Sequence, residues 1–315
     1  MTTDERRLAL RNERAQAAPY WGKVEPRIIL TFLLFSAAWI GVIVLGVNGT
    51  IPLWLGLILN TVIASTFYMP MHEATHGNIW GRTTSGKWIE DLIGMLCAIP
   101  LGFSYKAHRP SHMRHHAHTN DPLKDPDFHT AGPMHTVLKS WYGQVMLATF
   151  LPVFAFIPAA RKLLPTAMLV MMRAETGSKK LGLIQLRFWF FTHAFLVLAI
   201  LTGYGWQALM LWYLPSRIQA LWLLTIFAWF PHHPATEVGR YGDTRVAVFP
   251  GSRWLIRGHD HHAVHHLFPR VPHYRLRKLW ADIADDMVAK GVRSEGKALS
   301  ATGHINLRAN QTQRT

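Results

Sequence analysis

The chain contains two adjacent stretches without a single charged side chain. The first runs from Ile28 to Val47 and the second from Ile51 to Met71. Because a helix rises about 1.5 Å per residue, about 20 residues cross the roughly 30 Å hydrocarbon core of a bilayer. Only the turn Asn48-Gly49-Thr50 separates the two stretches. The sequence therefore predicts a tight transmembrane hairpin.

Further apolar stretches follow at about 92–103, 142–160, 186–203 and 205–230. Arg217 interrupts the last of them, and a charge inside the bilayer is costly. We therefore expect Arg217 near the far interface or in a polar pocket, with 215–230 as the spanning part and 205–214 partly along the interface. The fold class predicted is all-α, with four transmembrane helices in two hairpins plus interfacial helices. The stretches 92–103 and 142–160 are expected to be re-entrant or interfacial.

Basic residues are concentrated in particular segments. The 33 Lys and Arg exceed the 18 Asp and Glu, giving a formal charge of +15, yet both hairpin turns lack Lys and Arg. The positive-inside rule then places the basic segments in the cytoplasm. The localisation expected is that of a multi-pass protein, in a bacterial inner membrane. Three segments are predicted: a polar cytoplasmic segment (1–27), a membrane domain (28–290) and a polar, disordered tail (291–315). Residues 275–288 are expected to form an amphipathic helix on the membrane surface.

Histidine is unusually frequent, and it is clustered. Fourteen of the 19 histidines fall into four short groups, each beside the cytoplasmic end of an apolar stretch. The groups are His72 and His76; His108, His112, His115, His116 and His118; His232 and His233; and His259, His261, His262, His265 and His266. The predicted topology therefore gathers the four groups into one layer at the cytoplasmic face.

The spacing of these histidines is typical of metal sites on helices. In HxxxH, His72 and His76 share one helix face, and HxxHH occurs twice, at 112–116 and 262–266. Eight such imidazoles can hold two first-row metal ions with coordination positions left open. Imidazole binds Fe, Zn, Cu and Ni, so the ligand type does not name the metal. The single cysteine, Cys97, excludes an iron–sulfur cluster held by several thiolates.

Three other interpretations fit the motifs less well. His72-Glu73-Ala74-Thr75-His76 matches the HExxH of zinc proteases, but that site leaves about six clustered histidines unexplained. Soluble di-iron bundles use Glu-x-x-His with several further carboxylates, and no second such motif occurs here. A metal transporter would carry its ligands within the spanning helices. Glu73 is better interpreted as a hydrogen-bond acceptor that orients a ligand imidazole.

With these motifs the chain resembles the membrane fatty acid desaturase superfamily, which includes acyl-lipid desaturases, hydroxylases and desaturase-like carotenoid hydroxylases and ketolases. The matching segments are MHEATHG (71–77), HRPSHMRHHAHTNDPLKDPDF (108–128), WFPHHP (229–234) and HHAVHHLFPRVPHYRL (261–276). Their order relative to the apolar hairpins matches as well. The resemblance covers roughly residues 28–290.

The resemblance implies a di-iron centre held almost wholly by histidine. The implied ligands are His72, His76, His112, His115, His116, His232, His262, His265 and His266. His233, next to His232, leaves the choice between those two open. Asp125 and Asp127 are candidates for supporting the ligands or ordering the loop. His118 and His259 are left out of the ligand set.

The resemblance also implies an activity. It is an O2-dependent oxidation of an unactivated C–H bond in a long-chain lipid, with fatty-acyl desaturation favoured and hydroxylation of a carotenoid or other lipid as the alternative. The sequence carries no nicotinamide or flavin motif, so we expect an external electron donor, a ferredoxin or a b-type cytochrome with its reductase. The other partners expected are the bilayer and the lipid substrate, and no nucleic acid.

Overall fold

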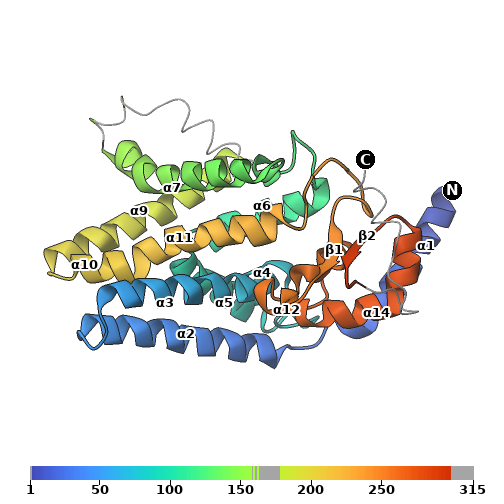
Figure 1. Cartoon of the computed structure of the whole chain (residues 1–315), viewed down its shortest axis with the longest axis horizontal. Coiled ribbons are helices and arrows are strands. Elements are labelled where there is room, and N and C mark those ends of the chain that lie inside the picture. Colours follow the sequence, from blue (N-terminus) through green and yellow to red (C-terminus); the bar gives the residue numbers. More distant parts are fainter. Residues whose placement is uncertain (1, 158, 160–161, 163–177, 299–315) are drawn as a thin grey trace.

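The computed structural model describes residues 2–157, 159, 162 and 178–298. Long helices run along the longest axis of the molecule and form a bundle, and shorter elements cap one end of it (Figure 1). Within the described residues, three helical segments are long and apolar enough to cross a membrane: Pro26–Val47, Leu53–His76 and Lys179–Leu201. The chain is therefore a mostly helical membrane protein.

The two helical arms of the first predicted hairpin are present. It consists of α2 (Pro26–Val47), α3 (Leu53–Thr66) and α4 (Tyr68–His76), with α2 packed against α3. The second arm is interrupted at Phe67, just before Pro70, whose ring nitrogen cannot donate the next helical hydrogen bond. Helix α4 ends at His76 because Gly77 adopts a left-handed conformation with φ of 70°. The HxxxH motif thus lies at the end of a candidate span.

The second hairpin has one long, irregular arm. Helix α9 (Lys179–Leu201) is followed by α10 (Gly205–Ala208), η4 (Leu209–Tyr213), α11 (Leu214–Leu223) and η5 (Leu224–Trp229). These last four elements follow one another in a single helical run that lies along α9 (Figure 1). The segment 205–214, expected partly along the interface, instead continues this run, and η4 packs against α2 and α3.

Helix α5 (Lys87–Leu101) ends inside the bundle, where its last carbonyl groups need donors. Arg217 Nη1 donates to the Gly102 carbonyl at 3.1 Å, and Gln219 Nε2 donates to the Leu101 carbonyl at 3.0 Å. Trp189 Nε1 also donates to Gly102, at 3.1 Å. Arg217 is only 7% exposed, so the polar pocket predicted for it is confirmed. These donors satisfy carbonyl groups at a helix end that is buried among other helices.

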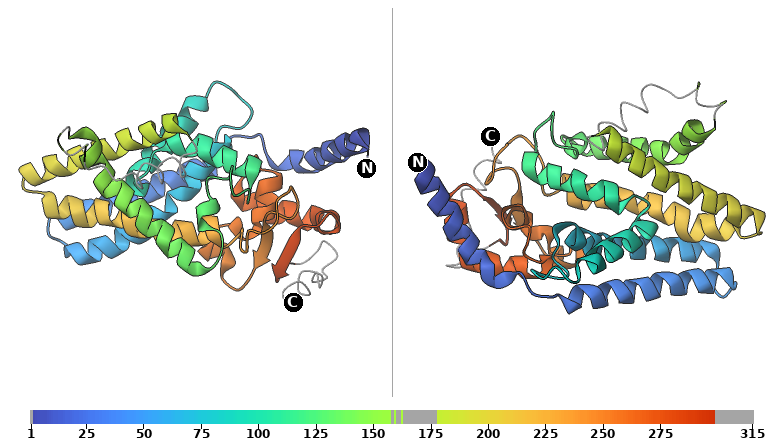
Figure 2. Two further views of the ribbon diagram at one scale, coloured as in Figure 1. Left: turned by 90° about the horizontal axis from the view of Figure 1, so that it is seen from above. Right: turned by 180° about the vertical axis from the view of Figure 1, so that it is seen from behind.

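Two further helices flank the bundle. Helix α6 (Tyr105–His118) carries the first HxxHH motif and packs against α4, α5 and α9. A loop containing the short helix η2 (Phe128–Thr130) leads to α7 (Met134–Phe156), which packs against α9 and α11. Figure 2 shows α7 lying obliquely across these helices. Of the predicted stretch 142–160, residues 142–156 belong to α7, and residues 158 and 160 lie outside the described residues.

The cap contains a small sheet that corrects the all-α prediction. Strands β1 (Arg245–Val248) and β2 (Arg293–Gly296) pair in parallel, with Arg245 opposite Arg293. The segment from 291 onward, expected as a disordered tail, thus begins with a strand. The sequence did not predict these strands, because each is too short to show the alternation of apolar and polar residues. Parallel strands far apart in sequence also lack the turn motif that marks a hairpin.

The rest of the cap is helical. Its elements are α12 (Ser252–Leu255), η6 (His259–His261), α13 (His262–Leu267) and α14 (His273–Ala289), with α1 (Thr3–Ala17) and η1 (Ala18–Tyr20) packed beside them. The predicted amphipathic helix exists as α14, but its apolar face does not face a membrane. Leu276, Leu279 and Ile283 are buried in a core shared with Val264 and Leu267. The apolar stripe had a protein partner, which periodicity alone cannot distinguish from lipid.

Candidate metal centre

The structure gathers the nine histidines implied by the resemblance into two groups. In each group, one ring nitrogen from every member lies within 4.8 Å of those of all the others. The five-histidine group comprises His72, His76, His112, His116 and His265, and the four-histidine group comprises His115, His232, His262 and His266. The groups adjoin, because the rings of His116 and His266 stack with centroids 4.1 Å apart.

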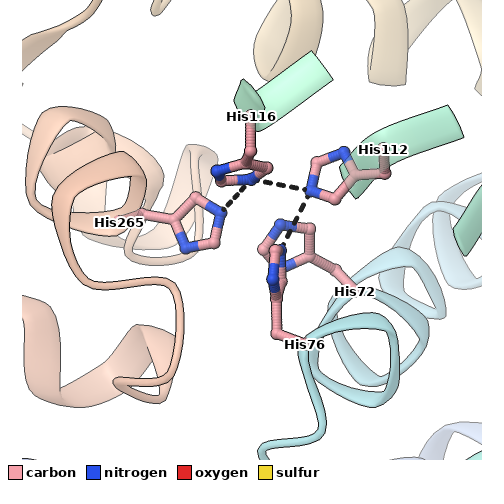
Figure 3. Close-up of side chains that lie close together, drawn as sticks. All are labelled: His72, His76, His112, His116 and His265. Atoms are coloured by element: carbon pink, nitrogen blue, oxygen red, sulfur yellow. Dashed lines mark hydrogen bonds between the residues drawn. The ribbon is translucent and has the colours of Figure 1, made fainter. Parts of the chain in front are cut away.

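In the five-histidine group the rings point toward one another from three helices, α4, α6 and α13 (Figure 3). The Nε2 atoms of His76 and His112 are 3.0 Å apart, those of His112 and His116 are 3.1 Å apart, and those of His116 and His265 are 3.0 Å apart. Two nitrogens that bind one metal ion at about 2.1 Å and at right angles lie about 3.0 Å apart. The spacing therefore suits a shared ion.

The four-histidine group has the same character. The Nε2 atoms of His232 and His262 lie 3.0 Å apart. Three of its histidines also have a protein partner at the nitrogen that points away from the group. His115 Nδ1 lies 2.8 Å from Asp125 Oδ1, and His266 Nδ1 lies 3.2 Å from Thr119 Oγ1. His262 Nδ1 lies 2.9 Å from Nδ1 of His259. Such outer contacts orient a ring and leave Nε2 free to bind a metal.

Burial keeps most of these rings neutral. It lowers the pKa of His262, His265 and His266 well below the ordinary 6.5, and neighbouring imidazoles lower it further. His115 is different: burial lowers its pKa, but the carboxylates of Asp127 and Asp125 outweigh this effect and raise it. Neutral imidazole is the form that binds metals, so the environment supplies lone pairs.

Several nitrogens at the centre are buried without any protein partner. They are Nδ1 and Nε2 of His72, Nδ1 of His116, Nδ1 of His232 and Nε2 of His266. Leaving buried polar atoms unpaired is costly, and a native structure rarely retains so many in one place. A nearly all-imidazole donor set is also suited to first-row metals. The residues therefore fit two metal ions.

The HxxHH motifs are divided between the two groups. His112 and His116 belong to the five-histidine group, whereas His115, between them in sequence, belongs to the four-histidine group. The second motif divides in the opposite sense, with His265 apart from His262 and His266. Consecutive helical residues differ by about 100° around the axis, so one motif contributes to both groups.

The structure separates His232 from its neighbour. His232 is buried within the four-histidine group, in the turn after η5. His233 instead lies against the indole of Trp229, with ring centroids 4.7 Å apart, and its Nδ1 is 3.2 Å from the Gly132 carbonyl oxygen. His233 is thus outside both groups.

Asp125 contacts both a histidine and its own loop. Besides His115, it accepts hydrogen bonds from the backbone amides of Asn120 and Asp127, each at 2.8 Å. Asp127 lies farther from His115, with Oδ2 3.7 Å from Nδ1. The carboxylate of Asp125 therefore couples the position of His115 to the fold of the loop after α6.

Glu73 does not orient any of the nine histidines, in contrast to the sequence-based interpretation. Its Oε1 accepts hydrogen bonds from the backbone amide and Nδ1 of His273, at 2.8 and 2.7 Å, and its Oε2 accepts one from Asn78 Nδ2 at 2.7 Å. The carboxylate joins the end of α4 to the start of α14. The sequence-based interpretation gave Glu73 the wrong partner, because His273 lies far away in sequence and no local pattern links the two residues.

Two supporting residues were missed by sequence reasoning. Thr119 contacts His266, and His259, left outside the predicted set, contacts His262 and is fully enclosed. Its position three residues before His262 was a usable signal, because i, i+3 neighbours share a helix face. His261 does not join either group: its Nδ1 lies 2.9 Å from Asp260 Oδ1.

A cavity of about 190 Å³ adjoins the histidines. His72, His112, His115 and His262 line it at one side, and His259 borders it as well. Apolar side chains from the bundle form much of the remaining wall, namely Tyr68, Phe103, Trp189, Leu223, Leu224 and Phe227. A substrate in this cavity would lie between helices and beside the metal-binding nitrogens.

The chain is similar to several known proteins. The chain is 27% identical over 223 residues to a beta-carotene ketolase of Paracoccus sp. (strain N81106 / MBIC 01143), covering 69% of this chain and 74% of the relative. It is 27% identical over 245 residues to an sn-1 acyl-lipid omega-3 desaturase (ferredoxin) of Synechocystis sp., covering 70% of this chain and 64% of that relative. A chloroplastic omega-6 fatty acid desaturase of Arabidopsis thaliana is 24% identical over 243 residues, covering 70% of this chain and 50% of the relative.

A sequence model for one family covers most of the chain. The fatty acid desaturase model matches residues 48–294, a range that includes all nine histidines of the two groups, strand β1 and the cap helices α12 to α14. This match extends over well more than half of the 315 residues. The chain therefore belongs to the fatty acid desaturase family.

Proposed function

We propose that this protein is a membrane oxidoreductase that uses two iron ions and O2 to oxidise an unactivated C–H bond of a long-chain lipid. One observation carries the proposal: two adjoining groups of buried imidazoles converge through their ring nitrogens beside a cavity between helices. The proposed ligands are the five- and four-histidine groups. Iron held there supplies the oxidising power, and the protein supplies orientation and a dry channel.

The roles of the protein side chains follow from their contacts. Asp125, Thr119 and His259 hold the outer nitrogens of His115, His266 and His262, so the inner nitrogens keep fixed directions. Phe227 and Leu223 keep water from the substrate carbon. In desaturation, two hydrogens leave the substrate, two electrons arrive from the external carrier and two protons from the solvent, and O2 becomes two molecules of water.

The substrate proposed first is a fatty-acyl chain, which would be desaturated. The apolar part of the cavity wall is compatible with a long hydrocarbon chain. A second candidate is oxidation of a carotenoid. It is favoured by the relatives, because beta-carotene ketolases match this chain over as large a share as the acyl-lipid desaturase does.

The electrons are proposed to come from a separate carrier. A ferredoxin or a b-type cytochrome with its reductase is an acidic partner, and the formal charge of +15 would attract it. The Synechocystis relative carries "(ferredoxin)" in its name. We propose a membrane domain over 28–290 with four spans, the fourth within 205–229, and the metal centre on the cytoplasmic face of a bacterial inner membrane.

Expression in two hosts tests the reaction. One host supplies fatty acids and the other carotenoids, each with a compatible electron donor, and lipids are analysed by mass spectrometry. Desaturation removes two hydrogens, hydroxylation adds one oxygen, and ketone formation adds one oxygen while removing two hydrogens. The His265→Ala variant serves as the inactive control. No new product in either host, from protein that retains iron, would contradict the proposed substrate classes.

Metal analysis separates this proposal from a zinc protease or a metal transporter. Purified protein should contain close to two irons per chain after anaerobic reconstitution. Protein that binds zinc and takes up no iron under these conditions would overturn the di-iron assignment. Iron that is bound and then released across vesicle membranes would instead support transport.

A further inference from the structure

A second cavity, of about 640 Å³, opens between the cap and the first hairpin. None of the nine clustered histidines lines it. One wall comes from α2 and the α3–α4 arm and is largely apolar, with Ile28, Phe35 and Met69. The other wall comes from α12, α14 and the segment between them. Five cationic side chains line the cavity: Arg27, Arg253, Arg257, Arg277 and Lys278.

Most of this positive charge is uncompensated. Within the part of the chain that the structure describes, Arg253, Arg277 and Lys278 form no ion pair or hydrogen bond through their side chains. Asp260 is the carboxylate that lines the cavity, and its oxygens already contact His261 Nδ1 and Ser252 Oγ, each at 2.9 Å. The cavity therefore offers several unpaired cations to an anion.

The other two cations have structural contacts that shape the cavity. Arg257 donates to the carbonyl of Ser65 at 2.6 Å and to its hydroxyl at 3.0 Å, where α3 ends. The guanidinium of Arg27 lies over the ring of Tyr274, 4.7 Å from its centroid. These contacts tie the cap to the hairpin at two places on the cavity wall.

The position of the cavity along the membrane normal can be inferred from α2. Arg27 is the second residue of that candidate span, so the cations lie where the chain enters the apolar layer. Trp254, on the cavity wall, is 84% exposed, and tryptophan is enriched at the level of lipid headgroups. The apolar wall continues from this level along α2.

We propose that this cavity binds one anionic phospholipid. Its phosphate lies among Arg253, Arg277 and Lys278, and one acyl chain lies against Ile28 and Phe35. The lipid joins the cap to the first hairpin, because its headgroup contacts α12 and α14 while its chain contacts α2. Lipid headgroups without net charge are not attracted to these cations, since basic residues near the membrane surface select anionic lipids.

Native mass spectrometry of the full-length protein in detergent tests the proposal. We expect one phosphatidylglycerol to be retained per chain, and added phosphatidylglycerol to raise the unfolding temperature, whereas phosphatidylcholine or inorganic phosphate does not. The variant Arg253→Gln/Arg277→Gln/Lys278→Gln should bind phosphatidylglycerol at least about tenfold more weakly. The matched control Lys106→Gln/Lys139→Gln/Lys180→Gln removes equal charge from exposed sites elsewhere and should bind like the unmodified protein.

A second variant tests the cavity without changing charge. Thr31→Trp on the α2 wall fills the acyl position and should also weaken phosphatidylglycerol binding. Equal binding by the triple variant and its control, or equal stabilisation by phosphatidylcholine, would overturn the proposal. Equal stabilisation by inorganic phosphate would show an anion site without a lipid, and would overturn it too. Iron content is measured in parallel, so failure here is separable from failure of the proposed oxidase function.

Discussion

The Nδ1 atom of His115 lies 2.8 Å from Oδ1 of Asp125, and both side chains are buried. The carboxylate fixes which nitrogen of His115 carries the proton, and His115 offers one ring nitrogen to the group that it forms with His232, His262 and His266. Asp125 also binds the backbone amides of Asn120 and Asp127. The conformation of the loop after α6 and the direction of one proposed iron ligand are therefore a single structural unit.

Asp125→Asn tests this unit. The amide keeps the size of the side chain but loses the charge that holds the His115 proton, so iron affinity or activity should fall about 10- to 100-fold. Iron per chain and product formation measure the effect. Asp121→Asn, a carboxylate of the same loop that caps the Leu123 amide, is the matched control and should retain iron. Unchanged iron binding together with unchanged product formation in Asp125→Asn would refute the orienting role.

His232 and His233 form a matched pair of neighbours. His232→Ala removes a nitrogen from the four-histidine group, so about half of the iron and nearly all activity should be lost. His233→Ala removes a ring that packs on Trp229 outside both groups and should keep its iron. Iron analysis by mass spectrometry compares the two proteins. The opposite pattern would assign the ligand role to His233.

The contact between Glu73 and His273 predicts a structural effect. Glu73→Gln cannot accept all three hydrogen bonds, so it should lower the free energy of unfolding by about 1–3 kcal/mol. A double-mutant cycle with His273→Ala should give a coupling energy of about 0.5–3 kcal/mol. Thermal unfolding measures both. If Glu73 were the base of a zinc protease, Glu73→Gln would leave stability intact and abolish only peptide hydrolysis.

Glu13 predicts a pH dependence of stability. Burial alone raises the pKa of its carboxyl, but hydrogen bonds from Tyr241, Arg240 and Lys290 outweigh burial, and the net pKa lies below the ordinary 4.5. Because the pKa is lowered by folding, the ionised carboxylate stabilises the folded state at pH values above the ordinary pKa. This stabilisation disappears as the pH falls through the lowered pKa. The difference in unfolding temperature between the unmodified protein and Glu13→Gln should therefore be largest near neutral pH and shrink below about pH 4.5. A pH-independent difference would contradict this account.

Much of the fold could be predicted from local patterns. The long apolar stretches located α2, α3 and α9, because chain length and bilayer thickness are related by a fixed helical rise. The need to shelter a charge predicted a polar pocket for Arg217. Local patterns did not reveal β1 and β2, whose pairing joins distant segments, or the protein core that covers the apolar face of α14.

The sequence by itself determined that the histidines lie at helix ends in i, i+3 and i+4 relationships, because helical geometry is local. Only the tertiary structure decided how they combine. His115 turns away from His112 and His116 to join residues of α13 and the turn after η5, and His265 joins the opposite group. The same holds for His259 beside His262 and for Glu73 beside His273. Which nitrogen meets which partner depends on how separate helices pack, and that packing is set by contacts between residues far apart in the chain.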